Sequence, residues 1–450
     1  MAEMTQRIPK RILASLLSSI SAGVVPRMGA PYIAIGRSEE IEALLSDLEA
    51  VSDGGASMRF IIGKYGSGKS FLIQLVRGYS IERGFITADA DLSPERRICG
   101  AKGTGVATYR ELIRNLASKS SPDGGALPQI IAKWLSELQS EIAGKGLAVG
   151  SEEFSRELTA RIYADTRELE AQIGGFDFAT VLTEYYRAYM DGDEAKKSAC
   201  MRWLRGEYSS KTEARNVLGM PIGGIIDDDN WYEYIKLLAV FFRKIGYRGF
   251  VVFVDECVNL YKIANRISRE NNYEKLLSMF NDTLQGKAEG LALIFGGTPQ
   301  FLEDTRRGLF SYEALRSRLS DGQFQKAGFK NLIGPVIRLR RLSDDELYAL
   351  IVRITALHAQ NYNWNPRVTN DDMVSFLKIC LDRAGADTMI TPREIIRDYM
   401  TVLNILMQNH DTSFADVVGS GAVTLAHGEA DEDAPTPEKK TEFTLADIEL

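Results

Sequence analysis

Residues 58–71 read MRFIIGKYGSGKSF. The residues at 58–62 are mostly apolar and predict a short buried strand. Gly63 to Ser70 then match the pattern GxxxxGK[ST], and a helix is expected from about Lys69. Glycines let such a loop wrap a phosphate chain with its N–H groups pointing inward, and the helix N-terminus adds positive potential. The stretch therefore predicts a nucleotide-binding loop; the alternative is a glycine-rich turn with an exposed lysine.

The residue types of this loop suggest separate roles in holding a nucleotide. Lys69 is expected to bridge the β- and γ-phosphates, and the Ser70 hydroxyl is expected to ligate Mg²⁺. ATP with Mg²⁺ is therefore the expected cofactor pair. The residues expected to contact it from the loop are Gly63, Tyr65, Gly66, Ser67, Gly68, Lys69, Ser70 and Phe71.

A second apolar run, FVVFVDE at 250–256, ends in two acids. Ligands of open α/β sheets bind at the carboxyl edge of the strands, so these acids are expected beside the nucleotide. Asp255 is expected to hold a Mg²⁺-bound water, and Glu256 to orient and deprotonate the attacking water. Adjacent side chains of a strand point to opposite faces, so the two acids can take different roles only near its end. The alternative is an acid pair that caps the strand.

Three further side chains complete the expected site. Thr298 follows another apolar run, and its hydroxyl is expected to hold the attacking water; the alternative is a strand-ending turn. Arg316 and Arg318 suggest an arginine finger given to a neighbouring subunit, with Arg318 favoured, against a solvated or ion-paired face. Arg393 lies at the start of a predicted helix with Thr391 as N-cap, where it is expected to reach the γ-phosphate unless it is only a surface arginine.

Periodicity along the chain predicts the fold class. The expected strands at 58–62, 85–91, 250–256, 291–297 and 336–342 alternate with helical segments, without hairpin signals. This pattern predicts an α/β fold: a five-stranded parallel sheet in a P-loop core, with a large helical insertion and a C-terminal helical lid. The expected segments are an N-terminal basic helix and arm at 1–35, the core at 36–342 with its insertion at about 105–245, the helical lid at 343–410, and an acidic, disordered tail at 411–450.

The N-terminal segment has the spacing of an amphipathic helix. Ile12, Leu13, Leu16, Leu17 and Ile20 recur at helical intervals, which favours a helix that docks on the body over a secretory signal peptide. No apolar run reaches the roughly 18–20 residues that a membrane-spanning helix needs. The four cysteines form no CxxC pair. These features favour a reducing, cytoplasmic location and no membrane partner.

Net charge restricts the classes of partner. The net charge is −7, but residues 429–450 carry eight acids and two lysines, so the rest of the chain is nearly neutral. Strong overall basicity, which is typical of nucleic-acid-binding proteins, is therefore excluded. The basic N-terminal helix is the best local candidate surface for double-stranded DNA; the alternative is a docking helix with a solvated basic face.

The order of these motifs resembles the P-loop ATPases of the AAA+ class, most of all their origin-recognition-like branch. In that branch an adenine-side box precedes the first strand, and Ile35-Gly36-Arg37 resembles it. The resemblance implies that Ile35 and Arg37 lie near the nucleotide. It also implies a Walker B pair at Asp255 and Glu256, a sensor 1 at Thr298, an arginine finger at Arg318 and a sensor 2 at Arg393.

A more specific resemblance covers most of residues 8–405. Six stretches look like the ATP-binding proteins of BREX-type phage-defence systems, in particular the BrxD family. This resemblance implies a bacterial cytoplasmic ATPase that works beside a methyltransferase, a phosphatase-like protein and a helicase. The six stretches lie at 23–37, 59–72, 90–97, 230–238, 295–319 and 391–399.

Three functions remain open at this point. The first is an ATPase switch or motor that forms a homo-oligomer, so that Arg318 completes a neighbour's site, and that passes its nucleotide state to partner proteins or DNA. The second is a nucleotide-dependent scaffold with negligible turnover. The third is a DNA loader of the replication-initiation or transposition type, against which the near-neutral body and the missing winged helix argue.

Overall fold

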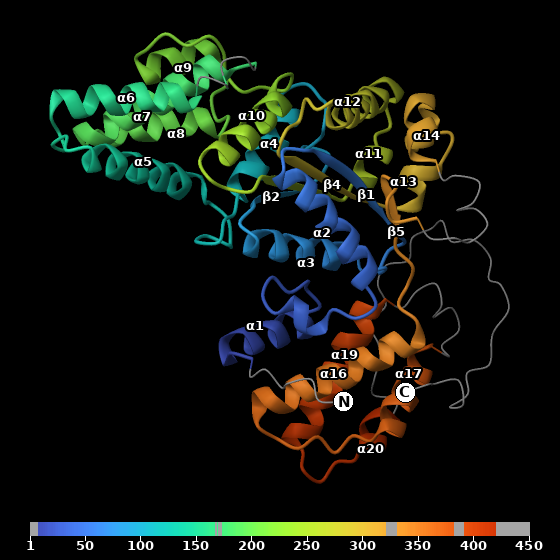
Figure 1. Cartoon of the computed structure of the whole chain (residues 1–450). Helices are drawn as coiled ribbons and strands as arrows, with labels where there is room; N and C mark the ends of the chain where they lie inside the picture. Colours follow the sequence, from blue (N-terminus) through green and yellow to red (C-terminus); the bar gives the residue numbers. More distant parts are fainter. Residues whose placement is uncertain (1–7, 167–168, 170–172, 321–330, 382–390, 420–450) are drawn as a thin grey trace. The chain divides into compact units, whose positions relative to one another are not determined.

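Five parallel strands form one sheet in the computed structural model shown in Figure 1. The strands are β1 (Ser57–Ile62), β2 (Ile86–Asp91), β3 (Phe250–Asp255), β4 (Leu291–Gly297) and β5 (Val336–Arg338). Their order across the sheet is β2-β3-β4-β1-β5, so the predicted five-stranded parallel sheet is confirmed. The structure describes residues 8–166, 169, 173–320, 331–381 and 391–419.

The strand bounds follow the apolar runs of the sequence. The first four predicted strands agree with the structure to within one residue at each end. The fifth was predicted over 336–342, which is wrong in length, because β5 ends at Arg338. Beyond it the carbonyl of Arg340 accepts a hydrogen bond from the Arg37 guanidinium at 2.7 Å, so the backbone there pairs with a side chain outside the sheet.

The chain divides into two compact units, which we call the sheet unit and the helical unit. The sheet unit comprises residues 40–62 and 76–338, and the helical unit comprises residues 1–39, 63–75 and 339–450. Two helices have residues in both, α2 (Ser38–Ser52) and α3 (Lys69–Glu82). The other helices of the sheet unit are α4 (Thr104–Arg114), α5 (Leu127–Gly144), α6 (Glu152–Thr166), α7 (Gly175–Asp191), α8 (Glu194–Leu204), α9 (Lys211–Leu218), α10 (Trp231–Lys244), α11 (Val258–Tyr261), α12 (Arg266–Leu284), α13 (Pro299–Glu303), the 3₁₀ turn η3 (Leu309–Ser311) and α14 (Glu313–Leu319).

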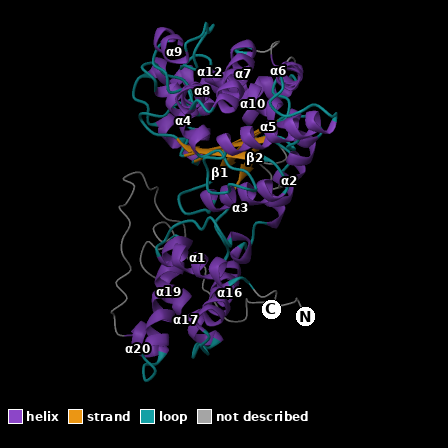
Figure 2. Ribbon diagram, turned by 90° about the vertical axis from the view of Figure 1, so that its left-hand side faces the viewer, coloured by secondary structure: helices purple, strands orange, loops and turns teal. Residues whose placement is uncertain are grey.

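Helices cover both faces of the sheet. α10 packs against β3 and β4, and α12 packs against β1. α2 lies on the other side of the sheet in both Figure 1 and Figure 2. A parallel sheet covered in this way is built from continuous apolar runs, and every residue of β4 is buried. Phe60 of β1 and Phe295 of β4 stack with their ring centroids 5.4 Å apart.

The stretch predicted to be a helical insertion, 105–245, contains α4 to α10. Aromatic side chains join these helices into the same core as the sheet. The Phe241 ring of α10 lies 5.2 Å from that of Trp134 on α5 and 5.4 Å from that of Phe178 on α7. Edge-to-face pairs of this kind add specific contact energy to the burial of apolar area.

The helical unit has its own apolar core. The predicted amphipathic helix is α1 (Lys10–Ser21). Of its predicted apolar residues, Leu13, Leu16, Leu17 and Ile20 are buried, whereas Ile12 is partly buried against the same core. The helix packs against α16 and α19. None of the helices among the described residues is long and apolar enough to cross a membrane. The remaining elements are η1 (Ala30–Ile33), α16 (Asp344–Tyr362), α17 (Asn370–Leu381), α19 (Pro392–Gln408) and α20 (Phe414–Gly419).

Candidate nucleotide site

Glycines give the phosphate loop its shape. Gly66 and Gly68 have φ angles of 74° and 86°. Glycine adopts this left-handed conformation at little cost. A Cβ atom built on Gly63 would lie 2.3 Å from Ser67 Oγ, and one built on Gly66 would lie 2.5 Å from Thr391 Cγ2. The loop is therefore wound too tightly for a side chain at either position, as expected of a backbone cradle for phosphate oxygens.

Lys69 begins α3 directly after the loop. Its Nζ donates to the carbonyl oxygen of Gly63 at 2.9 Å and to that of Lys64 at 3.2 Å. Ser70 follows in the first helical turn, where N–H groups lack intrahelical acceptors and favour an anion. The lysine and the helix start thus bring positive potential to the loop, and the hydroxyl of Ser70 is of the type that ligates Mg²⁺.

The other side chains of the loop differ in their surroundings. Ser67 is buried, and its hydroxyl oxygen has no hydrogen-bond partner among the described residues. Tyr65 is 72% exposed, so its ring is accessible to a ligand. Phe71 and Ile35 instead pack against the core of the helical unit.

Arg37 holds the backbone of the phosphate loop through a side-chain hydrogen bond. Its side chain is buried, and its Nη2 donates to the carbonyl oxygens of Ser67 at 2.9 Å and of Arg340 at 2.7 Å. A buried guanidinium with two carbonyl acceptors fixes the backbone that it joins. Sequence reasoning had associated this arginine with the nucleotide base and had missed its contact with the loop backbone.

The start of α19 lies beside the same loop, because the side chain of Thr391 contacts Gly66. Thr391 is the N-cap, as predicted: its hydroxyl accepts from Glu394 N–H at 3.3 Å, while Glu394 Oε2 accepts from Thr391 N–H at 2.8 Å. This reciprocal capping box fixes where the helix begins. Arg393 is exposed in the first turn of that helix.

In the sheet unit, Asp255 ends β3 and the chain turns at Glu256. Glu256 has a φ angle of 57°, which is uncommon for a residue other than glycine. Its N–H donates to Asp255 Oδ1 at 2.8 Å, and Cys257 N–H donates to Gly296 O of β4 at 3.0 Å. Because of this turn, the side chain of Glu256 no longer follows the alternating directions of the strand. Two adjacent acids can take different roles only under this condition. Strained backbone of this kind is often found at functional sites.

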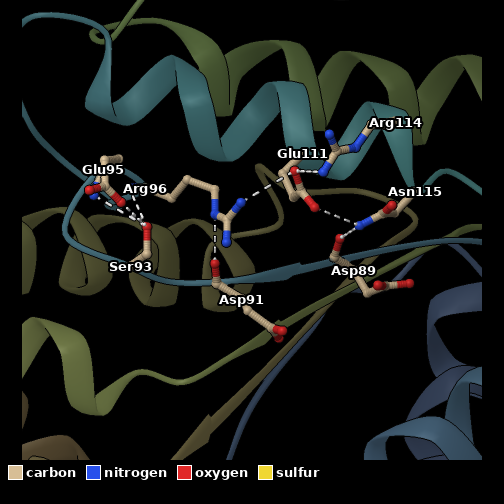
Figure 3. A network of polar contacts seen from close by, with 8 residues as sticks. All are labelled: Asp89, Asp91, Ser93, Glu95, Arg96, Glu111, Arg114 and Asn115. Carbon is tan, nitrogen blue, oxygen red and sulfur yellow. Dashed lines mark hydrogen bonds and ion pairs between the residues drawn. The ribbon is translucent and has the colours of Figure 1, made fainter.

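A third carboxylate, Asp91, ends β2 at the same edge. It pairs with Asp255 in the register of β2 and β3. The surrounding protein and the neighbouring charge of Asp255 raise the pKa of Asp91 above its ordinary value. Figure 3 shows Asp91 beside Arg96, whose Nε donates to the Asp91 carbonyl at 2.9 Å. Sequence reasoning missed Asp91, although an acid at the carboxyl end of a second predicted strand was the available signal.

Thr298 follows β4 at this edge and caps a short helix. Its hydroxyl oxygen accepts from Phe301 N–H at 3.3 Å, and Pro299 occupies the first helical position. The hydroxyl of Thr298 can still donate its own proton while it accepts that bond. Thr298 therefore lies directly after the end of β4, as predicted, and also in a turn, which was the alternative.

The two candidate finger arginines lie in the last turn of α14. Arg318 Nη1 donates to the Ala314 carbonyl at 2.8 Å, whereas Arg316 lies 3.7 Å from the carboxylate of Glu313. Both side chains are exposed, as an arginine given to a neighbouring subunit has to be. An exposed i,i+3 pair such as Arg316 with Glu313 contributes little to stability.

The structure thus groups the predicted residues in two sets. The helical unit holds the phosphate loop together with Ile35, Arg37 and Arg393, and the sheet unit holds Asp255, Glu256, Thr298 and Arg318. In the first set, the tight glycines and the lysine fit the phosphates of a nucleotide. In the second, carboxylate and hydroxyl oxygens fit Mg²⁺ and its bound water.

Comparison with known proteins supports this interpretation at the level of the family. None of the curated proteins compared with the chain matches it. A family model described as the BREX system ATP-binding protein BrxC/D matches residues 8–421, which includes every predicted site residue. The chain therefore belongs to the family of BREX system ATP-binding proteins BrxC/D.

Proposed function

We propose that the protein binds ATP with Mg²⁺ and hydrolyses it, as a nucleotide-driven component of a BREX phage-defence system. The observation that carries this proposal is the common edge of the sheet. β1 ends there at Ile62, directly before the phosphate loop. Asp255 is the last residue of β3, and Thr298 directly follows β4 at the same edge. Membership of a family of ATP-binding proteins supports the nucleotide.

The proposed mechanism gives each part of the edge a distinct task. The loop N–H groups and Lys69 bind the phosphates, and Ser70 and Asp255 hold Mg²⁺ and its bound water. Glu256 takes a proton from the attacking water, which Thr298 orients. Arg393, and Arg318 from a neighbouring copy, stabilise the charge that develops on the γ-phosphate.

The nucleotide state would then be passed to partners. BREX systems are phage-defence systems, so the proposed partners are the other proteins of the system: a methyltransferase, a phosphatase-like protein and a helicase. Double-stranded DNA is a further proposed partner, with the basic side of α1 as its candidate surface. A homo-oligomer is proposed because the exposed Arg318 needs a neighbouring site to complete.

The test is phosphate release by the purified chain with ATP and Mg²⁺, alone and with double-stranded DNA. We expect Glu256→Gln to lower turnover by about 10²–10⁴-fold while ATP still binds, because general-base catalysis contributes on that scale. Lys69→Ala is expected to abolish ATP binding as well. Arg187→Gln, an exposed arginine of α7 distant in sequence from every motif, serves as the control and should leave both unchanged.

Two results would contradict parts of the proposal. Equal turnover in Glu256→Gln and the unaltered chain would remove Glu256 as the base. ATP binding without phosphate release, even with DNA and a partner protein present, would favour the nucleotide-dependent scaffold.

A further inference from the structure

A cavity of about 540 Å³ lies in the sheet unit, apart from the phosphate-loop residues. It is formed by the loop after β2, by α4, by the start of α5 and by the chain between α8 and α9. Its volume falls within the range of small-molecule sites, roughly 300–1,000 Å³. Four arginines line it: Arg96, Arg110, Arg114 and Arg205.

Carboxylates offset only part of this charge. Glu111 lies 3.5 Å from Arg96 and also pairs with Arg114, as Figure 3 shows. Glu207 lies 3.8 Å from Arg205. With four guanidinium groups and two carboxylates in its lining, the cavity keeps an excess of two positive charges.

Arg110 differs from the other three arginines. Its Nε donates to the carbonyl of Gly206 at 2.6 Å, which fixes the plane of the guanidinium. No carboxylate lies within ion-pair distance of it among the residues that the structure describes. A guanidinium held by one bond, with donors left over and no counter-charge, is suited to a bidentate contact with an anion.

The rest of the wall is apolar. Ile113, Leu127 and Pro128 line the cavity together with the arginines. A site with apolar side chains and a few charged groups selects a ligand that has both characters. A phosphate monoester carries about two negative charges, which matches the excess in the lining, and a nucleoside supplies the apolar part.

We infer that this cavity binds the 5′-phosphate of a nucleotide, as a site separate from the phosphate loop. The phosphate is held by Arg110 and Arg205, with Arg114 at the rim, and the nucleoside lies against Leu127 and Pro128. A free nucleotide and the 5′-phosphorylated end of a DNA strand present the same group.

The cavity is also connected to the acid edge of the sheet. Arg96 lines the cavity and donates to the carbonyl of Asp91, the neighbour of Asp255 in the sheet. A ligand that draws Arg96 away from Glu111 would therefore act on the strand end that holds the acids. This coupling rests on the proposed ATPase function, whereas binding to the cavity does not.

Calorimetry with three probes tests the binding directly. dTMP, the dinucleotide pdTpdT and its unphosphorylated form dTpdT are titrated into the full chain saturated with ADP and Mg²⁺, and into Lys69→Ala without ADP. We expect one phosphate-dependent site per chain in both preparations. Binding of dTMP and pdTpdT alike assigns the site to free nucleotides, and binding of pdTpdT alone assigns it to strand ends.

Matched variants locate the site. Arg110→Gln and Arg205→Gln are each expected to weaken binding by about tenfold or more, because each removes a charge-assisted contact. Arg114→Gln is the second variant, since that side chain is 70% exposed and its loss does not disturb packing. Arg187→Gln is its control, because Arg187 makes the same i,i+3 pair with Glu184.

The inference is overturned if neither phosphorylated probe binds at millimolar concentration, or if dTpdT binds equally well. It is also overturned if Arg110→Gln and Arg114→Gln fold normally and bind as the unaltered chain does. Loss of ATPase activity in Glu256→Gln with phosphate binding retained would separate this site from the proposed function.

Discussion

The two units hold their parts of the candidate site by different means. In the helical unit, the phosphate loop is supported by residues distant in sequence: Arg37 reaches Ser67 across 30 positions and Arg340 across 303. In the sheet unit, Asp255 and Asp91 are positioned by the register of neighbouring strands. A register is shared by many backbone bonds, whereas the loop depends on single side chains.

Single substitutions should therefore have different effects in the two units. Removing one support of the loop should change both stability and nucleotide binding. Removing one acid from the sheet edge should change chemistry while the strands keep their pairing.

The largest effect is expected for Arg37→Ala. The substitution leaves the buried carbonyl of Ser67 and the part-buried carbonyl of Arg340 without this donor, at a cost of roughly 3 kcal/mol. Hydrogen exchange is expected to accelerate in α16 and α19 of the helical unit and to stay unchanged in β3. Arg316→Ala, at an exposed pair in the sheet unit, should change local stability by less than about 0.5 kcal/mol. Equal effects of the two substitutions would show that the helical unit does not depend on the Arg37 side chain more than the sheet unit depends on Arg316.

The second prediction separates backbone strain from steric overlap in the loop. Gly68→Ala places a Cβ in open space and should cost only the left-handed conformation, about 1–2 kcal/mol. Gly66→Ala has the same strain, and its Cβ also overlaps Thr391. We therefore expect ATP affinity to fall about tenfold in Gly68→Ala and about 100-fold or more in Gly66→Ala. Equal losses in a fluorescent-nucleotide titration would show that Thr391 does not support the loop.

The same contrast explains what the sequence predicted and what it did not. The run FVVFVD gives β3 by local pattern alone, and the motif GxxxxGK[ST] gives the loop. The role of Arg37 depends on two carbonyls that come near it only in the folded chain. Asp91 likewise gains its importance from strand order, because it lies 164 positions from Asp255 along the chain and comes beside it only through the sheet register. Local patterns therefore predicted the elements, while long-range polar partners had to come from the structure.

The third prediction concerns pH. The two histidines within the described part of the chain, His358 and His410, belong to the helical unit. His358 is buried; its Nδ1 accepts from Trp364 Nε1–H at 2.9 Å, and its Nε2 lies 3.0 Å from Asn404 Oδ1. Burial lowers the pKa of His358, so its contribution to stability is present above the unfolded value of about 6.5 and is lost as the pH falls.

This loss should be confined to the helical unit. One proton gives a slope of at most about 1.4 kcal/mol per pH unit. Hydrogen exchange of α16, corrected for the intrinsic rate, is expected to show this slope below pH 6.5, and exchange of β3 is not. His358→Gln, which keeps a neutral polar group, should flatten the response. A slope that persists in this variant would assign the response to another group.

The smallest effect is expected at Asp91, where the change of stability with pH has the opposite sign to that of His358. Its raised pKa means that the folded chain binds the proton more tightly, so stability is lost as the pH rises through the folded pKa. Asp91→Asn removes the repulsion with Asp255 and should stabilise the ends of β2 and β3 at pH 7 by less than about 1 kcal/mol.

Asp89, two residues earlier on β2, is the matched control for this last prediction. Its carboxylate lies 2.9 Å from Arg77 Nε, and that arginine is buried. Asp89→Asn should therefore destabilise the same strand, by about 1–3 kcal/mol, because it leaves the guanidinium without its counter-charge. If the two substitutions changed the hydrogen exchange of β2 in opposite directions, the carboxylates of Asp91 and Asp255 would be shown to repel one another in the folded chain. If Asp91→Asn also destabilised β2, the carboxylate of Asp91 would have to be a structural partner there, and the sheet unit would depend on single side chains as the helical unit does.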